Sequence, residues 1–520
     1  MKILVADPIA EQGLQLLRSH AQVDVKPRLQ AEQLKDIIAD YDALIVRSRT
    51  RVGAEVIEAG QKLKVIGRAG VGTDNIDVDV ATRRGIVVVN APTGNTVAAA
   101  EHTIALMLAL ARNVTQAHHQ LKSGKWQREK LVGTELRNKT LGIIGLGNVG
   151  SEVAKRAHAF EMRILAHDPF VSQEYAHNLN ARLVPLNELL AEADFITLHV
   201  PLTAATRKLI GSKELARLKP TARIINCARG GLIDEEAVVK AIRSGGLAGA
   251  AFDVFANEPA TDSPLFQEDN VIVTPHLGAS TIEAQASVAK DVAEEVIAVL
   301  QGQFSRYAVN APHIAPELAP YMRLATTMGS LASQLMEGQI KSTHIIYSGG
   351  IANYDCEPIK TALISGLLQQ TSEERVNIVN VGLISAQRGL KVSEEREMTC
   401  RNYPNLLTLE VNTSAAITTI SGTVRDDEIH VVQVDDFWMD IVPTGEHFLL
   451  CEHLDRPGLV GTIGSIIGEA DINISSMHLS RLQPKGRALM TLALDQPLSQ
   501  EQLQEIRNLP GIYRAKTVNL

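Results

Sequence analysis

Three ionisable residues, Arg229, Glu258 and His276, each follow a short apolar run of the sequence. An arginine can bind a carboxylate through two parallel hydrogen bonds and polarise the neighbouring carbonyl, because its charge is permanent. A histidine can take the proton of a hydroxyl while a hydride leaves the same carbon. A glutamate on the other ring nitrogen fixes the tautomer and favours the imidazolium. Together the three residue types predict oxidation of a 2-hydroxy acid, or the reverse reaction.

A glycine-rich loop precedes these residues. The apolar run 140–144 leads into GLGNVG, and residues 151–159 are predicted to be helical. In this strand–loop–helix setting Gly145 permits a tight turn, Gly147 lets the backbone approach a pyrophosphate and Gly150 lets the helix pack on the strand. The first turn of the helix offers free N–H groups to an anion. The loop therefore predicts a dinucleotide site.

An acidic residue, Asp168, ends the next apolar run at 162–167. At this position a carboxylate can accept hydrogen bonds from the adenosine ribose. The same carboxylate would repel the 2′-phosphate of NADP, and Pro169 rather than an arginine follows it. We therefore expect NAD as the cofactor; the alternative is that Asp168 is only a turn residue before proline.

The elements that must position these groups are the strands of a parallel sheet. Further short, continuous apolar runs occupy residues 195–200, 222–227, 248–254 and 271–274. Such runs, separated by helical segments, are typical of a parallel sheet that is covered on both faces. Ligands of open α/β sheets bind beyond the carboxyl ends of the strands. We therefore expect the arginine, the glutamate and the histidine to meet at one edge. Each of them alone also has a structural explanation, as a surface loop, a turn cap or a satisfied histidine.

Three segments of the sequence resemble the signatures of the D-2-hydroxyacid dehydrogenases. They are NCARGGLID at 226–234, FDVFANEP at 252–259 and PHLGAS at 275–280. The resemblance covers residues 1 to about 305, returns at the C-terminus and is strongest to the phosphoglycerate-oxidising members. It implies Arg229 as the substrate and carbonyl binder, His276 as the acid/base and Glu258 as its partner. It also implies cofactor contacts from Asn148, Val149, Asp168, Val200, Cys227, Ala228 and Asp253.

Arginines near the N-terminus bear on the choice of substrate. An extended backbone would place Arg47, Arg49 and Arg51 on one face of a strand. Arg68 stands in a second glycine turn, whose N–H groups could receive an anion. A substrate with a carboxylate and a phosphate needs such cations. The resemblance to the phosphoglycerate members supports Arg47, Arg68 and Arg128 as substrate-binding residues, whereas we expect Arg49 and Arg51 to be solvated.

Composition narrows the class of protein. A chain of 520 residues has room for three or four domains, and a net charge of −8 without a long basic run argues against a nucleic-acid partner. The most apolar helical segment, 96–111, contains Glu101 and His102 and is too short to span a membrane, so we expect no membrane contact. Four widely spaced cysteines and a sequence that begins directly with a strand predict a cytoplasmic protein without a metal site.

The fold prediction is α/β, with two doubly wound Rossmann-like domains, an α+β intervening domain and a small C-terminal domain. The substrate domain is expected to be discontinuous, because the predicted helix 282–300 returns the chain to the first unit. Three prolines between residues 312 and 320 mark a linker. After an apolar helix at 322–335, alternating strands and helices are expected to about residue 444. The predicted domains are residues 1–95 with 286–308 (substrate), 96–285 (NAD), 309–444 (intervening) and 445–520 (C-terminal).

The C-terminal domain has the predicted order βαββαβ of a ferredoxin-like split unit. Its strands are expected at 447–454, 473–482, 487–494 and 511–518. With HLDRPG at 453–458, this order resembles the amino-acid-sensing ACT domain. In that family, residues matching His453, Asp455 and Asn473 hold serine between paired domains. Some serine-inhibited members have asparagine where Asp455 stands, although an aspartate can still pair with the serine ammonium. The resemblance implies a homo-oligomer, a dimer or tetramer, with L-serine as a candidate effector.

Two functions from different classes remain open. One is the NAD-dependent oxidation of D-3-phosphoglycerate to 3-phosphohydroxypyruvate, the first step of phosphorylated serine biosynthesis, with serine feedback. The other is a regulator that binds NAD and an amino acid without turnover. Intact Arg229, Glu258 and His276 favour the enzyme. Within the enzyme class, a glyoxylate or D-lactate dehydrogenase is the alternative, although such enzymes usually lack a sensing tail.

Overall fold

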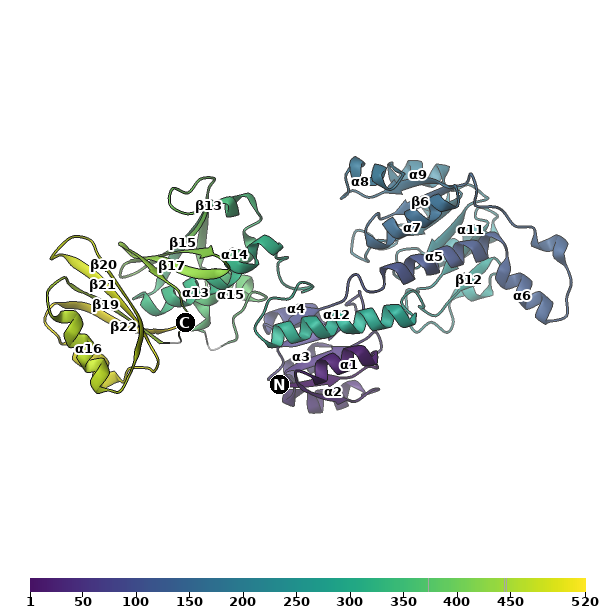
Figure 1. Cartoon of the computed structure of the whole chain (residues 1–520). Coiled ribbons are helices and arrows are strands. Elements are labelled where there is room, and N and C mark those ends of the chain that lie inside the picture. Colours follow the sequence, from purple (N-terminus) through teal and green to yellow (C-terminus); the bar gives the residue numbers. More distant parts are fainter. Residues whose placement is uncertain (373, 444, 446) are drawn as a thin grey trace.

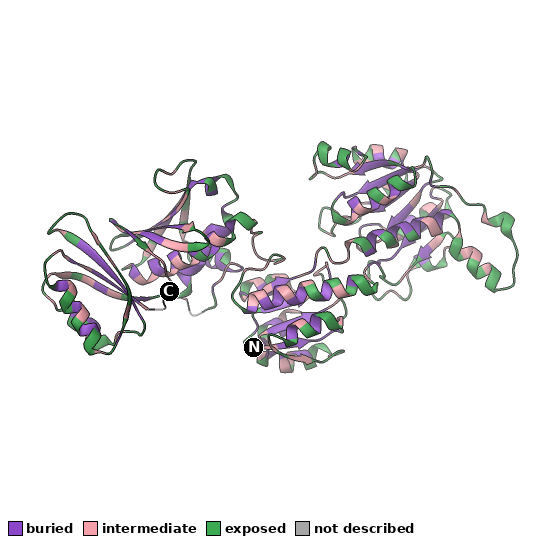
Figure 2. Ribbon diagram, viewed as in Figure 1, coloured by how far each residue is buried: buried purple, intermediate pink, exposed green. Residues whose placement is uncertain are grey.

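The computed structural model describes residues 1–372, 374–443, 445 and 447–520. It contains four sheets, two of them fully parallel. Figure 1 shows an elongated molecule in which the C-terminal sheet (yellow), the intervening sheet (green), the N-terminal sheet (purple) and the nucleotide-loop sheet (blue) follow one another in space. Buried residues are concentrated on the strands and on the inward helix faces (Figure 2). This arrangement confirms the predicted fold class.

The first sheet has five parallel strands in the order β2-β1-β3-β4-β5. Its strands are β1 (Lys2–Val5), β2 (Gln22–Val25), β3 (Ala43–Val46), β4 (Val65–Arg68) and β5 (Val87–Val89). Helices α2 (Ala31–Ile37), α3 (Ala54–Ala59) and α4 (Val78–Arg83) cover one face. The other face is covered by α1 (Glu11–Arg18) and α12 (Ile282–Leu300). The return of α12 to this sheet is as predicted, because its valines at 288, 292 and 296 enter the same core as β1 and β3.

The second sheet has seven parallel strands in the order β12-β11-β10-β9-β6-β7-β8. Its strands are β6 (Thr140–Ile144), β7 (Arg163–His167), β8 (Ala181–Leu183), β9 (Phe195–Leu198), β10 (Arg223–Asn226), β11 (Gly249–Phe252) and β12 (Val271–Val273). Its helices are α5 (Thr96–Ala111), α7 (Asn148–Ala159), α8 (Gln173–Asn178), α9 (Leu186–Glu192), α10 (Ser212–Leu215) and α11 (Glu235–Arg243). Every predicted strand is present. Four of them end one or two residues earlier than predicted, because the chain turns at the carboxyl edge.

A helical arm projects from this domain (Figure 1, right). It spans residues 114–132 and contains α6 (Val114–Lys122) and the 3₁₀ turn η2 (Arg128–Leu131), and none of the described residues of either element is buried. The arm exposes the large apolar side chains of Trp126 and Val132, at 79% and 80% of their surface. Within the part of the chain that is described, no single helix is long and apolar enough to cross a membrane; only α5 and α6 together pass that test, and they are bent by 63°.

The intervening region contains a six-stranded mixed sheet in the order β14-β13-β15-β16-β17-β18. Its elements are α13 (Ala319–Leu335), β13 (Ile340–Gly349), α14 (Glu357–Gln369), α15 (Val381–Gln387), β14 (Lys391–Glu397), β15 (Asn405–Thr413), β16 (Ile417–Arg425), β17 (Glu428–Val434) and β18 (Phe437–Ile441). The predicted alternation of strands and helices is wrong beyond Asn405, where the chain forms an antiparallel meander. Tight turns rather than helices join these strands. The predicted end of this region, residue 444, lies outside the described residues.

The C-terminal sheet has the antiparallel order β20-β21-β19-β22. Its elements are β19 (His447–Leu454), α16 (Leu459–Glu469), β20 (Ile474–Arg481), β21 (Arg487–Leu494), α17 (Gln500–Arg507) and β22 (Ile512–Asn519). This is the predicted ferredoxin-like βαββαβ order. Helices α16 and α17 cover one face. On the other face Phe448, Leu450 and Val518 share a core with α13 of the intervening region.

Candidate active site

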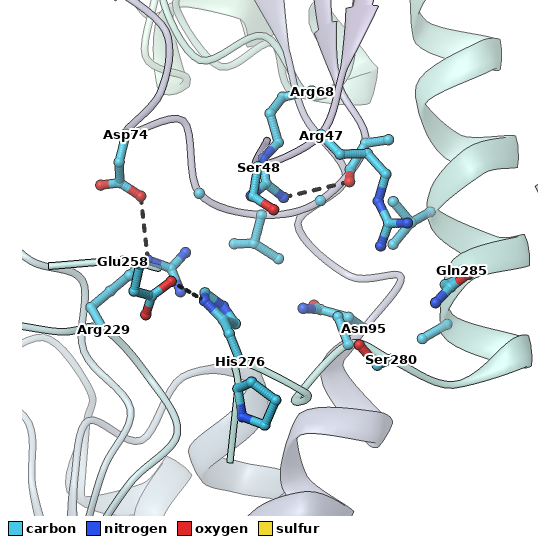
Figure 3. A pocket seen from close by; sticks show the side chains of 18 of the residues that line it. Arg47, Ser48, Arg68, Asp74, Asn95, Arg229, Glu258, His276, Ser280 and Gln285 are labelled. Carbon is cyan, nitrogen blue, oxygen red and sulfur yellow. Dashed lines mark hydrogen bonds and ion pairs between the residues drawn. The ribbon is translucent and has the colours of Figure 1, made fainter. Parts of the chain in front are cut away.

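A pocket of about 400 Å³ lies where the carboxyl ends of the first two sheets face each other. The first sheet contributes Arg47 and Arg68, which follow β3 and end β4. The second sheet contributes Arg229, Glu258 and His276, and Figure 3 shows their side chains around a common space. The structure thus brings together the three predicted catalytic residues and two of the three predicted substrate arginines.

His276 and Glu258 form a direct pair, with 2.7 Å between Nδ1 and Oε2. The second carboxylate oxygen of Glu258 accepts the Phe255 N–H at 3.0 Å. Burial alone would raise the pKa of Glu258, but the hydrogen bonds from His276 and Phe255 outweigh it and hold the pKa below its usual range. Because an ionised carboxylate only accepts, Nδ1 carries the hydrogen. The imidazole Nε2 is then the nitrogen left for a substrate hydroxyl.

Asp253, which directly follows β11, holds the loop that carries His276. Its side chain is fully buried, and its two oxygens accept the N–H groups of Leu277 at 2.7 Å and Gly278 at 2.9 Å. Burial would raise the pKa of Asp253, but hydrogen bonds from His102, Thr274 and the Leu277 N–H lower it overall. Asp253 is therefore a carboxylate beneath the loop. The resemblance assigned it a cofactor contact, and it does not line the pocket.

Arg229 is fixed by the end of the strand before it. The buried Asn226 side chain donates to the Arg229 carbonyl at 2.9 Å and accepts the Ala228 N–H at 3.1 Å. A Cβ on Gly230 would lie 1.7 Å from the Phe255 carbonyl oxygen, so only glycine lets this loop approach the loop that carries Glu258. The Arg229 guanidinium meets Asp74 with 3.6 Å between Nε and Oδ2 (Figure 3). Asp74 is largely exposed, and a substrate carboxylate could replace it.

Among the described residues, neither of the two arginines of the first sheet forms an ion pair with a carboxylate. Buried Asp7 accepts the N–H groups of Arg47 at 2.6 Å and of Thr50 at 3.2 Å, which fixes the turn after β3. Burial, with repulsion from Arg229 and Arg47, lowers the pKa of Arg68 to about 10. Its buried Nε has no hydrogen-bond partner among the described residues. Three guanidinium groups at one pocket favour a ligand with more than one negative charge.

The prediction that three alternating arginines share a strand face is wrong. Strand β3 ends at Val46, and residues 48–50 bend. The Arg49 side chain lines a neighbouring pocket of about 690 Å³ behind the His276–Glu258 pair, and Arg51 lines neither pocket. Asp7 causes the difference, because it draws two backbone N–H groups into a turn. The expected solvation of Arg49 and Arg51 agrees with their exposure.

The glycine loop joins β6 to α7 as predicted. Gly145 has φ +94°, and a Cβ there would lie 2.5 Å from the His199 carbonyl oxygen. A Cβ on Gly147 would meet nothing within 4 Å, and no side chain caps the first turn of α7. Asp168 accepts the N–H groups of Leu146 and Phe170, both at 2.8 Å. The loop therefore presents open backbone N–H groups, at Asn148, Val149 and Gly150, that fit a dinucleotide pyrophosphate.

The other predicted cofactor residues follow β9 and β10. Val200 and Ala228 are half-buried and pack on one face of the sheet, and Cys227 packs on the other. Burial raises the pKa of the Cys227 thiol to about 12, so the group is neutral. Among the described residues, no group of three or more histidine, cysteine, aspartate or glutamate side chains could hold a metal ion.

Two sets of predicted residues are not brought together. Arg128 lies in η2 on the arm and does not line the pocket. His453 and Asp455 lie at one end of the C-terminal sheet, where His453 is opposite Ala488 of β21. Asn473 precedes the strand whose Ile474 is opposite Leu494, at the other end of β21. The separation along β21 is about 20 Å, so one chain cannot close an effector site from all three residues.

Sequence reasoning missed several residues that line the pocket. Asn95, before α5, and Gln285, in the first turns of α12, both face it (Figure 3). Ser48 and Asp74 line it from the first domain. The signal for Gln285 was present, because α12 begins directly after the PHLGAS segment. Asp74 carried no signal, since its loop meets Arg229 only through the tertiary fold.

Comparison with known proteins gives three family matches. Residues 104–278 match the NAD binding domain of the D-isomer specific 2-hydroxyacid dehydrogenases, residues 317–435 the D-3-phosphoglycerate dehydrogenase intervening domain, and residues 447–511 the ACT domain. The D-3-phosphoglycerate dehydrogenase of Synechocystis sp. is 48% identical, over the whole of this chain and 95% of its own length. That of Archaeoglobus fulgidus is 43% identical over the whole of both chains.

Solved structures resemble a part of the chain. The TT0316 protein of Thermus thermophilus has 35% identity and a TM-score of 0.56, covering 59% of this chain and all of its own. D-lactate dehydrogenase of Aquifex aeolicus, solved with NAD and lactic acid, has 27% identity and a TM-score of 0.55, covering 60% of this chain and all of its own.

Proposed function

We propose that this chain, which belongs to the D-3-phosphoglycerate dehydrogenase family, oxidises D-3-phosphoglycerate to 3-phosphohydroxypyruvate with NAD. One observation carries the proposal: the His276–Glu258 pair shares a pocket with the guanidinium groups of Arg229, Arg47 and Arg68. A phosphorylated hydroxy acid has a carboxylate and a phosphate for these three cations. A D-lactate or glyoxylate dehydrogenase would need only one of them, and a regulator would need no base.

The chemistry divides among the residues as follows. Arg229 binds the substrate carboxylate and polarises the oxygen at C2. Nε2 of His276 takes the hydroxyl proton, while the carboxylate of Glu258 stabilises the imidazolium that forms. NAD supplies the acceptor for the hydride that leaves C2. Arg47 and Arg68 bind the phosphate, and the open N–H groups of the glycine loop together with Asp168 hold the dinucleotide.

The test of this function is NADH formation from D-3-phosphoglycerate, with 3-phosphohydroxypyruvate trapped chemically to pull the reaction forward. D-lactate, glycolate and D-glycerate are run in parallel. We expect turnover with the phosphorylated acid and a much lower kcat/KM with the others, because only the phosphate engages Arg47 and Arg68. Equal or better turnover of D-lactate or glycolate would favour another hydroxyacid dehydrogenase, and no turnover with any acid would favour the regulator.

The chain is proposed to act as a homo-oligomer. The arm of α6 and η2 has no core of its own and exposes Trp126 and Val132, which suits it to pack on a second copy. Arg128 would then reach the pocket of the partner rather than its own. The division into a substrate domain (1–95 with 286–308), an NAD domain (96–285), an intervening domain and an ACT domain remains part of the proposal. All four cysteines are free, which supports the cytoplasm as its compartment.

A mixing experiment tests the role of Arg128. Chains with Arg128→Ala are expected to show a raised KM for phosphoglycerate, and chains with His276→Ala almost no turnover. Unfolding and refolding the two variants together should restore normal-KM activity, because mixed oligomers contain a pocket with an intact His276 and an Arg128 from the partner. Lys122→Ala, on the same arm, serves as the control with normal KM. Mixtures that show only the raised KM would refute action across the interface.

L-serine is the proposed effector, bound between two C-terminal domains. Strand β20 is an edge strand, so a two-fold copy pairing along it would bring Asn473 of one chain towards Asp455 of the other. In the single chain Asp455 pairs with Arg481 at 3.3 Å, and Asn473 donates to Asp495 at 3.0 Å. The Asp455 carboxylate can pair with the serine ammonium.

Replacing Asp455 and Asn473 together with alanine is expected to abolish inhibition by L-serine and to leave the basal rate within about twofold of the original. The physical reason is that neither residue lines the catalytic pocket and that their contacts within the chain, with Arg481, Lys485 and Asp495, all lie in the C-terminal domain. The measurement is the initial rate against serine concentration, with Glu469→Ala on the surface of α16 as the control. Inhibition that survives the double change would place serine elsewhere.

A further inference from the structure

The loop from Thr274 to Gly278, which carries His276, is folded around Asp253. The His276 N–H donates to the Asp253 carbonyl at 2.8 Å, and the Asp253 carboxylate accepts the N–H groups of Leu277 and Gly278. The Thr274 hydroxyl donates to the same carboxylate at 2.6 Å. His276 itself has φ +57°, a conformation that costs a non-glycine residue energy. The placement of the imidazole therefore depends on bonds made by its neighbours.

A second histidine, on a helix, bonds to both Thr274 of this loop and Asp253. His102, on α5, places Nε2 3.1 Å from the Thr274 hydroxyl oxygen and 3.2 Å from Oδ1 of Asp253. Its side chain is 19% exposed and that of Asp253 is fully buried. The Thr274 hydroxyl gives its hydrogen to Asp253, and the carboxylate can only accept, so Nε2 of His102 must be the donor. His102 thus donates a hydrogen bond to the Thr274 hydroxyl and the Asp253 carboxylate, at the place where the loop begins after β12.

We propose that His102 is a positioning residue for the base: its Nε2–H clamps Thr274 onto Asp253 and so holds the His276 imidazole in the orientation that hydride transfer needs. The proposal rests on the proposed function, in which His276 is the base. His102 touches neither the pocket nor the His276 ring, so it acts through the loop. Residues that do not touch the substrate can orient the catalytic side chains through hydrogen bonds. A misplacement of a catalytic group by about 1 Å can lower the rate about 10²-fold.

The position of α5 gives this clamp a second consequence. The helix begins just after Asn95, which lines the pocket, and it carries the chain from the first sheet into the second. His102 lies near the middle of α5 and bonds the loop of the base. The clamp ties the connection between the domains to the catalytic loop.

Two substitutions at His102 separate positioning from simple packing. His102→Leu keeps the bulk and removes the donor, whereas His102→Gln keeps an N–H near the place of Nε2. With phosphoglycerate and NAD, we expect His102→Leu to lower kcat about 10-fold and to change the phosphoglycerate KM less than about twofold, because the substrate arginines lie on other elements. His102→Gln should recover kcat to within about threefold. Glu101→Gln, one residue away on the exposed side of α5, is the control.

A second measurement needs no substrate. Acylation of His276 by diethyl pyrocarbonate, followed by mass spectrometry of its peptide near neutral pH, reports how the ring is presented to the pocket. We expect the rate at His276 to change at least threefold in His102→Leu and to return in His102→Gln. Equal rates in all three chains, or equal loss of kcat in both variants, would overturn the proposal. Absence of turnover in the unaltered chain would instead refute the proposed oxidation, and the acylation rates would still decide whether His102 places His276.

Discussion

Replacing His276 with alanine is expected to lower kcat by about 10²–10⁴-fold, the usual contribution of a general base. The hydroxyl proton then has no acceptor, since Glu258 is turned towards the backbone N–H of Phe255 and the missing ring. Binding of NAD should be unchanged, because the glycine loop and Asp168 lie on other loops of the sheet. The measurement is steady-state turnover of phosphoglycerate together with NADH binding followed by fluorescence.

His158→Ala is the matched control for this experiment. His158 is an exposed histidine near the end of α7, so its removal tests for unspecific effects of losing an imidazole. We expect it to retain full activity. A kcat for His276→Ala within threefold of the unaltered chain would remove His276 from the mechanism, and loss of NADH binding in that variant would point to a change in folding instead.

Arg229 gives the second large effect. Truncating one member of a buried, hydrogen-bonded ion pair costs about 2–5 kcal/mol, or roughly 30- to 5,000-fold in kcat/KM. We therefore expect Arg229→Ala to lose kcat/KM for phosphoglycerate by this amount, through both kcat and KM, because Arg229 is proposed to bind the carboxylate and to polarise the reacting oxygen. Arg229→Lys should recover only part of the loss, since an ammonium cannot make the two parallel bonds of a guanidinium.

The comparison variant for Arg229 is Arg217→Ala, an exposed arginine beyond α10. It should behave like the unaltered chain. If Arg229→Lys recovered full activity, charge alone would explain the role of the residue and the bidentate contact would be wrong. If Arg229→Ala changed KM without changing kcat, the residue would bind the substrate without polarising the reacting carbon–oxygen bond.

Much of the catalytic half could be predicted from the sequence, because local signals and the fold agree there. The strand before the glycine loop was predicted with its observed bounds, Thr140–Ile144, as was the helix Ile282–Leu300. Parallel strands with both faces buried are continuous apolar runs, and side chains that follow them must meet at one edge. The proximity of Arg229, Glu258 and His276 follows from that rule and needs no knowledge of their contacts.

The misses share a physical cause, which is tertiary contact that the local sequence does not encode. The turn at Arg47 depends on Asp7, 40 residues earlier, and the clamp from His102 depends on Thr274, 172 residues later. The meander from Asn405 is set by antiparallel pairing between consecutive strands, and the prediction of intervening helices did not allow for the tight turns that join them. The separation of Asn473 from Asp455 follows from the direction of β20, which the sequence indicates only through the whole βαββαβ order.

The core shared by the C-terminal sheet and α13 limits where such proteins can be truncated or their domains exchanged. Strand β19 sends Phe448 and Leu450 to α13, and Leu449 and Cys451 to its own helices, so the sheet is apolar on both faces. Gln334 on α13 exchanges two hydrogen bonds of 2.8 Å with Asn519 near the C-terminus. A deletion or graft at the start of β19 would leave an apolar surface on both fragments. The unit that can be transferred to another protein is therefore the intervening region together with the C-terminal domain. A chimaera that contains the C-terminal domain alone would expose an apolar face that is prone to aggregation.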